Sequence, residues 1–176
     1  MGLQTIVMEA ADLSQQFREL LERHRKILFK VANSYCRDPH ERADLAQEIA
    51  TQLWRAFPAY DGQRSFSTWM YRIALNVAIS FARTNSQRER HAVPLDEELH
   101  EMAGDTGAEP EADERVRILY RCIEQLDPLN RALLLLYLDE RSQREIAEIL
   151  GISETNVATK IGRLKQRIRN DMAEHA

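Results

Sequence analysis

The sequence predicts an all-α protein of two small helical domains joined by a flexible acidic linker, with a helix-turn-helix in the C-terminal domain. Three observations lead to this prediction. Apolar residues recur at intervals of three and four, and no stretch of any length alternates as a β-strand does. Asp-Pro and Asp-Gly pairs, which form turns, separate the periodic segments. One acidic, aperiodic segment divides those segments into two groups.

The N-terminal domain is expected over residues 14–90 and contains three helices. The first covers residues 14–35 and ends before Asp38-Pro39. The second, residues 41–56, carries Leu45, Ile49 and Leu53 at intervals of four, which gives it one buried face. The third begins near Ser65 and reaches about residue 83, after which we expect a basic loop. Tyr71 lies off the apolar stripe of this helix and is therefore expected to be exposed.

Residues 91–113 form the predicted linker. Between residues 91 and 114 there are nine carboxylates and no Lys or Arg, and Pro and Gly recur. A flexible tether of about 23 residues spans about 25–30 Å, close to one turn of DNA at roughly 34 Å. The C-terminal domain is expected over residues 114–172. Asp127 and Pro128 start its apolar core helix.

The strongest local signal lies in residues 142–169, which read as two helices joined by a tight turn. Gly151 suits a left-handed cap on the first helix, and Ser153 can cap the second. One side of the second helix is apolar, with Val157, Ile161 and Leu164. The other side carries Thr155, Asn156, Thr159, Lys160, Arg163 and Arg167. This layout predicts a helix-turn-helix whose second helix enters a DNA major groove.

Composition narrows the function classes further. The net charge is -4, but residues 153–170 carry five cations and one anion, and local fields govern phosphate binding. The longest apolar run, residues 132–138, is too short to span a bilayer, so we expect no membrane insertion and a cytoplasmic location. Cys36, Cys122 and the five histidines show no metal-ligand or catalytic spacing. We therefore expect no enzyme activity, no cofactor and no metal.

Three segments together resemble sigma factors of the sigma-70 family, in the small two-domain extracytoplasmic-function (ECF) group. DPHERADLAQEIATQLWRAF (residues 38–57) resembles region 2.2 of the family, and RSFSTWMYRIALNVAISFAR (residues 64–83) resembles regions 2.3 and 2.4. Residues 126–168, which contain the helix-turn-helix, resemble region 4.

The resemblance implies a subunit that directs core RNA polymerase to promoters and assists promoter opening, as a monomer on the polymerase. Its partners would be core RNA polymerase and promoter DNA, and it allows an anti-sigma factor as a further partner. Residues 14–90 would be region 2, which binds polymerase and the -10 element, residues 91–113 the acidic linker, and residues 114–172 region 4, which binds the -35 element.

The resemblance also assigns binding roles to individual residues. For each of them, the alternative interpretation is an ordinary solvated polar surface without a binding role. Polymerase binding falls on Asp44, Leu45, Gln47, Glu48 and Ile49. Contacts to the -10 element fall on Arg72, Asn76, Ser80, Arg83, Asn85, Ser86 and Arg88. Contacts to the -35 element fall on Arg144, Thr155, Asn156, Thr159, Lys160, Arg163 and Arg167. Gly162 weakens the last helix, which either allows close approach to DNA or shortens the rigid helix.

Two other functions remain open at this point. One is a stand-alone helix-turn-helix DNA-binding regulator with an N-terminal dimerisation or sensor domain, which predicts dimers and palindromic half-sites. It leaves the matches at residues 44–48 and 66–76 unexplained. The other is a protein-interaction bundle without a DNA role, against which the cations of residues 160–169 argue.

Overall fold

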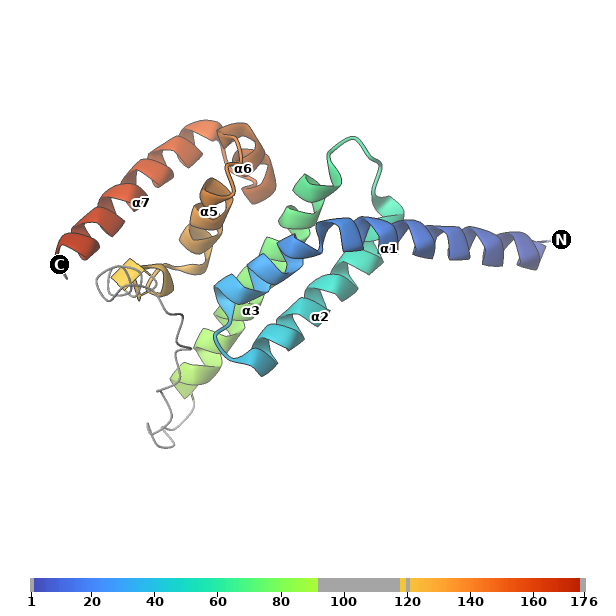
Figure 1. The fold of residues 1–176 in the computed structure, drawn as a ribbon, viewed down its shortest axis with the longest axis horizontal. Coiled ribbons are helices and arrows are strands. Elements are labelled where there is room, and N and C mark those ends of the chain that lie inside the picture. Colours follow the sequence, from blue (N-terminus) through green and yellow to red (C-terminus); the bar gives the residue numbers. More distant parts are fainter. Residues whose placement is uncertain (1, 92–117, 120, 175–176) are drawn as a thin grey trace, which may run out of the picture.

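The computed structural model describes residues 2–91, 118–119 and 121–174, and all regular structure in that part of the chain is helical (Figure 1). The N-terminal domain contains α1 (Gly2–Tyr35), α2 (Pro39–Ala56), the 3-10 turn η1 (Phe57–Ala59) and α3 (Phe66–His91). The C-terminal domain contains α5 (Pro128–Leu138), α6 (Gln143–Leu150) and α7 (Glu154–Glu174), preceded by helical residues 118–119 and 121–124. The all-α prediction is confirmed, whereas the predicted linker lies outside the described residues except for residue 91.

Local capping interactions set the starts of several helices. Asp38 accepts hydrogen bonds from the backbone N–H groups of His40 and Glu41 at the start of α2. Asp127 does the same for Asn130 in α5, at 3.0 Å. Ser142 and Glu145 form a reciprocal capping box on α6. Gly151 ends α6 with φ 68°, the left-handed conformation that the sequence predicted.

Two helices are longer than expected. The first begins at Gly2 instead of residue 14, and α3 continues to His91 instead of ending near residue 83. The expected basic loop after residue 83 is therefore wrong. Residues 84–91 contain no Pro or Gly, and Gln, Arg and Glu are good helix formers, so nothing in the sequence stops the helix there.

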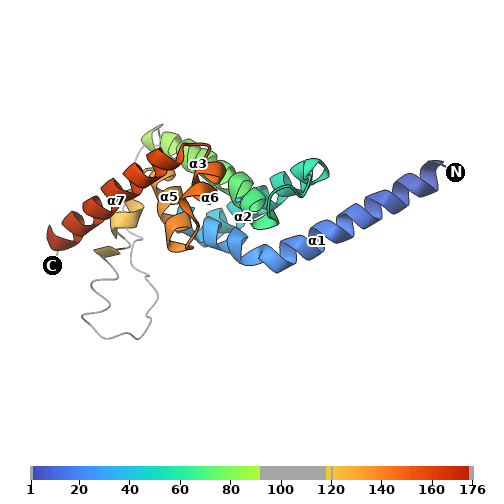
Figure 2. The ribbon, with the colours of Figure 1, turned by 90° about the horizontal axis from the view of Figure 1, so that it is seen from above.

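The two domains lie against each other. In Figures 1 and 2, α5 and α6 lie beside α3, and α5 also contacts α1. Buried apolar residues of both domains form one continuous cluster, which includes Tyr71, Leu75 and Ala78 of α3 and Leu133 and Leu136 of α5. The expectation that Tyr71 is exposed is wrong, because the C-terminal domain helps to bury the side of α3 on which it lies.

Candidate nucleic-acid and polymerase interfaces

The outer face of α7 gathers the residues predicted to contact the -35 element. Thr155, Asn156, Thr159, Arg163 and Arg167 are exposed, and Lys160 is half-buried. The opposite side of the helix buries Val157, Ile161 and Leu164 against the domain core. Ser153 accepts a hydrogen bond from the Asn156 N–H at 3.1 Å and so fixes the start of the helix. The 3.6-residue period therefore places every polar residue of this set on the outward half of α7.

Neighbouring contacts restrict some of these side chains. The hydroxyl of Thr159 donates to the Thr155 carbonyl at 2.9 Å, so in this conformation it can only accept hydrogen bonds from DNA. Arg167 lies 3.8 Å from Asp171 one turn later. The ammonium group of Lys165 lies 4.3 Å from the centre of the Tyr137 ring. Arg144, in the first turn of α6, is exposed.

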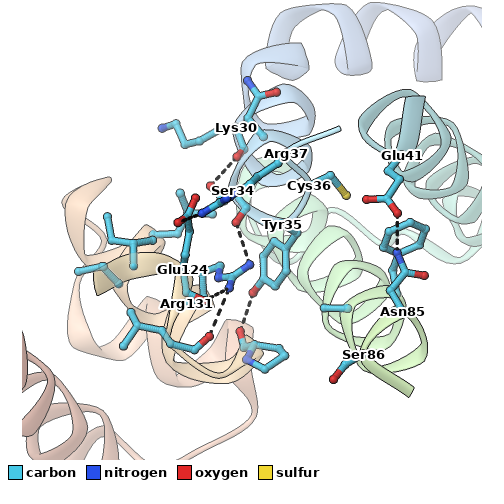
Figure 3. A pocket seen from close by; sticks show the side chains of 18 of the residues that line it. Lys30, Ser34, Tyr35, Cys36, Arg37, Glu41, Asn85, Ser86, Glu124 and Arg131 are labelled. Atoms are coloured by element: carbon cyan, nitrogen blue, oxygen red, sulfur yellow. Dashed lines mark hydrogen bonds and ion pairs between the residues drawn. The ribbon is translucent and has the colours of Figure 1, made fainter. Parts of the chain in front are cut away.

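The residues predicted to contact the -10 element fall on two sides of α3. Arg72, Asn76, Ser80 and Arg83 follow one another at intervals of four, four and three, and all four are exposed, so they share one face. Asn85 lies on another side, where its amide donates to Glu41 at 3.3 Å, and Ser86 lines the same groove as Asn85 (Figure 3). The side chain of Arg88 is outside the described residues.

A cavity of about 290 Å³ lies at the N-terminal end of this exposed α3 face, and sequence reasoning did not predict it. Its lining combines aromatic rings, an amide, a carboxylate and two cations: Ala59, Tyr60, Asp61, Arg64, Trp69, Arg72, Ile73 and Asn76. The Tyr60 and Trp69 ring centres are 5.0 Å apart, and the Tyr60 hydroxyl donates to the Arg64 carbonyl at 2.7 Å. Gly62, with φ 71°, allows the chain to turn back toward α3. The Asp61-Gly62 pair was the available sequence signal for this turn.

On α2, the five residues predicted to bind polymerase separate into a surface and a core. Asp44, Gln47 and Glu48 are exposed, and Glu48 accepts a hydrogen bond from Gln52 at 2.7 Å. Leu45 and Ile49 are 0% exposed and belong to the core of the N-terminal domain. The prediction that these two side chains contact a partner is corrected accordingly, because the fold itself already buries them.

Between the domains lies a groove of about 830 Å³, shown in Figure 3. The Tyr35 hydroxyl donates to the Pro128 carbonyl at 2.7 Å, and burial raises the pKa of this phenol. Arg37, two residues after the end of α1, pairs with Glu124 across the groove. Burial, followed by the nearby Glu41 carboxylate, raises the pKa of the Cys36 thiol to about 11, so the thiol is protonated at neutral pH.

Among the described residues, no group of three or more His, Cys, Asp or Glu side chains is arranged to hold a metal ion. No helix in that same part of the chain has the length and apolar character that crossing a membrane requires.

Known protein families match both helical domains. The Sigma-70 region 2 profile matches residues 20–88, and the Sigma-70, region 4 profile matches residues 117–168. The chain is 28% identical over 171 residues to the ECF RNA polymerase sigma factor SigW of Bacillus subtilis (strain 168), covering 90% of this chain and 89% of SigW. It is 31% identical over 136 residues to the ECF RNA polymerase sigma-E factor of Escherichia coli (strain K12), covering 72% of this chain and 71% of that protein.

Solved structures share the fold. CnrH in complex with the cytosolic domain of CnrY is similar with a TM-score of 0.67 and 21% identity, over 97% of both chains. The sigma factor RpoE from Bartonella quintana, solved with the anti-sigma factor NepR, has a TM-score of 0.65 and 16% identity, over 92% of this chain and 97% of RpoE. The matches to both regions and to relatives across most of their length show that this chain belongs to the ECF group of sigma-70 family RNA polymerase sigma factors.

Proposed function

We propose that this chain directs core RNA polymerase to specific promoters and assists their opening through three separate surfaces. The α2 surface (Asp44, Gln47 and Glu48) binds polymerase, the exposed α3 face (Arg72, Asn76, Ser80 and Arg83) contacts the -10 element, and the outer face of α7 reads the -35 element. The observation that carries the proposal is that the domain matching region 2 exposes the first two surfaces and the domain matching region 4 exposes the third.

The outer α7 face suits duplex recognition. Asn156 and Arg163 can form bidentate hydrogen bonds to adenine and guanine edges in the major groove. Lys160 and Arg167, with Arg144 on α6, can neutralise phosphates on either side of the groove. Each base-specific pair would contribute about 1–3 kcal/mol of discrimination, whereas the phosphate contacts would add affinity that depends on salt rather than sequence.

The α3 face suits a separated strand. Trp69 and Tyr60 offer ring surfaces in the cavity, and stacking of a base on an aromatic side chain contributes roughly 1–3 kcal/mol. Asn76 lies in the same lining and can hydrogen-bond a base edge, while Arg72 and Arg83 can hold phosphates. A base that leaves the duplex can thus be accepted where the cavity meets the exposed helix face.

The α2 surface suits a basic partner. Asp44 and Glu48 are four residues apart and exposed, so both carboxylates point away from the core on the same side of the helix. We place the protein in the cytoplasm with polymerase and DNA, and it performs no covalent chemistry of its own. Because CnrH and RpoE were solved with CnrY and with the anti-sigma factor NepR, a protein of the anti-sigma class is a further candidate partner.

The test is reconstitution of initiation. The purified chain is mixed with core polymerase and a genomic promoter library, and co-elution and transcript start sites are measured. We expect a one-to-one complex and starts preceded by two dissimilar elements. Failure to co-elute in the absence of any inhibitor would refute the proposal, and a dimer that binds palindromic sites without polymerase would instead support the stand-alone regulator.

Two pairs of variants locate the surfaces. Glu48→Lys on α2 should abolish co-elution, whereas Glu19→Lys, which reverses an exposed charge on α1, should not. Arg163→Ala should weaken binding to -35 duplex, whereas Arg169→Ala, an exposed position outside the outer α7 face, should have a smaller effect. Equal effects within either pair would refute the assigned surface.

A further inference from the structure

The N-terminal end of α1 lies outside the helical bundle of the N-terminal domain. In both Figure 1 and Figure 2, this end of the helix extends past the other described helices and lies beside none of them. The Sigma-70 region 2 profile begins only at residue 20, so this end precedes the part of the chain that the family profile covers. We call residues 2–12 the α1 extension. None of the three surfaces proposed above includes it.

The apolar side of α1 continues from the bundle into the α1 extension. Apolar residues recur at intervals of three, four, three and four: Leu3, Ile6, Ala10, Leu13 and Phe17. On a helical backbone these intervals place the five positions on one side, in the pattern that pairs helices in coiled coils. Phe17 is buried in the bundle, and Leu13 is half-buried against the same core. Before Leu13, no other helix of the described chain lies beside this side of α1.

Trp54 of α2 connects the apolar side of α1 to the α2 surface. Its ring centre lies 5.2 Å from that of Phe17, yet the residue remains 41% exposed. Trp54 comes seven residues after Gln47, which is about two helical turns, so the two share one side of α2. The α2 surface therefore leads across Trp54 to α1, and from there along the apolar side of α1 into the α1 extension.

The size of the α1 extension argues against a second copy of this chain as the partner. Residues 2–12 rise about 17 Å along the helix axis, and a helix is about 10 Å wide, so one side covers on the order of 200 Å². A specific interface buries about 800 Å² on each partner. Two paired α1 extensions therefore lack the area of a stable dimer. A partner that already binds the α2 surface can add this area to its own contact.

Charge defines the chemistry of that partner. Residues 2–16 contain Glu9 and Asp12 but no Lys or Arg, and the α2 surface exposes two carboxylates of its own. Carboxylates beside an apolar stripe suit an amphipathic helix whose apolar side is bordered by Lys or Arg. Such a helix can contact both parts at once, with the Trp54 ring between them as an aromatic anchor of the kind that dominates binding at interfaces.

We propose that core polymerase binds the α1 extension and Trp54 together with the α2 surface, through a basic amphipathic helix of the enzyme. The inference rests on the proposed function, because it takes the partner of the α2 surface to be polymerase. The α1 extension adds apolar area to a contact that otherwise presents polar side chains. An isolated helical segment of about three turns is marginal in water, so docking also stabilises the α1 extension itself.

The first measurement is the affinity of the chain for core polymerase. Ile6→Glu places a carboxylate on the apolar side of the α1 extension, and Gln4→Glu places the same group on the opposite side. Losing one buried Ile side chain corresponds to a factor of roughly ten or more, so we expect Ile6→Glu to raise the Kd by that factor. Gln4→Glu should stay within about twofold of wild type. Equal Kd values for the two variants would overturn the proposal.

The same measurement tests the anchor, with Phe29→Ala as the control for Trp54→Ala. Phe29 is 52% exposed on α1 but lies on the side turned away from Phe17, outside the proposed contact. Trp54→Ala should raise the Kd roughly thirtyfold, whereas Phe29→Ala should match wild type. Wild-type affinity in Trp54→Ala would overturn the anchor. Ile6→Glu lies outside the bundle and should keep the wild-type urea midpoint, so it remains decisive even if Trp54→Ala proves not to fold.

Hydrogen exchange locates the contact directly. In the complex with core polymerase, the amides of residues 3–12 should exchange at least tenfold more slowly than in the free chain. Unchanged exchange would overturn the proposal. Protection that instead develops in the free chain as its concentration rises, together with a dimer mass from light scattering, would overturn it in favour of a second copy.

Failure of this inference and failure of the proposed function are distinguishable. Co-elution of the wild-type chain with core polymerase judges the proposed function, and a wild-type chain that fails to co-elute overturns both. A chain that co-elutes and initiates, but whose Ile6→Glu variant binds polymerase as tightly as Gln4→Glu, is a sigma factor whose α1 extension stays off the enzyme.

Discussion

Replacing Gly162 with alanine should stabilise the protein measurably. Gly162 lies inside α7 and is exposed, and a Cβ atom built there meets nothing within 4 Å. Glycine in the interior of a helix costs about 0.8–1.0 kcal/mol relative to alanine, because it loses more backbone freedom on folding. With no clash to offset the gain, Gly162→Ala should raise the free energy of unfolding by that amount. For a protein of this size, the corresponding rise in Tm is roughly 2–4 °C.

The assay is thermal unfolding followed by circular dichroism, with Ala158→Gly as a mirror control. Ala158 is exposed one turn earlier on α7, so its replacement should lower Tm by a similar amount. An unchanged or lower Tm for Gly162→Ala would refute the reasoning. Because α7 continues to Glu174, Gly162 does not shorten the helix, and close approach to DNA remains the alternative. In that case the alanine variant would be more stable but would bind -35 duplex more weakly.

Three further predictions concern the turn between α5 and α6. Ser142→Ala removes the capping box and should lower the free energy of unfolding by about 1 kcal/mol in urea titrations. Glu140 has φ 57°, which costs a side-chain-bearing residue roughly 1–2 kcal/mol, so Glu140→Gly should raise the urea midpoint whereas Glu140→Ala should not. The pKa of Glu145 is lowered, first by the hydrogen bond from the Ser142 backbone N–H. Burial alone would raise the pKa of Asp139, but hydrogen bonds from Lys30, Tyr71 and Arg141 outweigh it and lower this pKa. Their contribution to stability is therefore present above about pH 4 and is lost as the pH falls through the folded-state values, and Asp139→Asn with Glu145→Gln should flatten this part of a stability–pH curve.

Where structure depends on neighbours in sequence, the sequence was sufficient to predict it. Contacts within four residues in sequence produce the left-handed cap at Gly151, the hydrogen bond that the Ser153 hydroxyl accepts from the Asn156 N–H, and the start of α5 at Asp127-Pro128. The buried and exposed sides of α7 also follow from the helical period alone. The residue at which α3 ends did not follow from the helical period, because a polar segment such as residues 84–91 is compatible with either helix or loop.

Contacts between distant segments could not be predicted in the same way. Lys30 and Asp139 form an ion pair although they are 109 residues apart in the sequence. Neither residue stands in a pattern that distinguishes it from other surface charges. Tyr71 looked exposed because only the stripe facing its own domain was visible in the sequence, whereas α3 has a second buried side against the C-terminal domain. The cavity on α3 was missed for a related reason, since residues 59–64 and α3 must fold before their side chains meet.

The α2 segment shows why a motif match and a binding surface must be separated by experiment. Leu45 is 0% exposed, so Leu45→Ala should cost about 2–5 kcal/mol of stability and weaken polymerase binding by partly unfolding the domain. Glu48→Lys changes an exposed charge and should abolish co-elution while leaving the urea midpoint near that of wild type. Binding measured at a temperature where Leu45→Ala remains folded should then recover for that variant but not for Glu48→Lys. If instead folded Leu45→Ala still fails to bind, Leu45 must leave the core on docking, and the division of α2 into a core side and a binding side would be wrong.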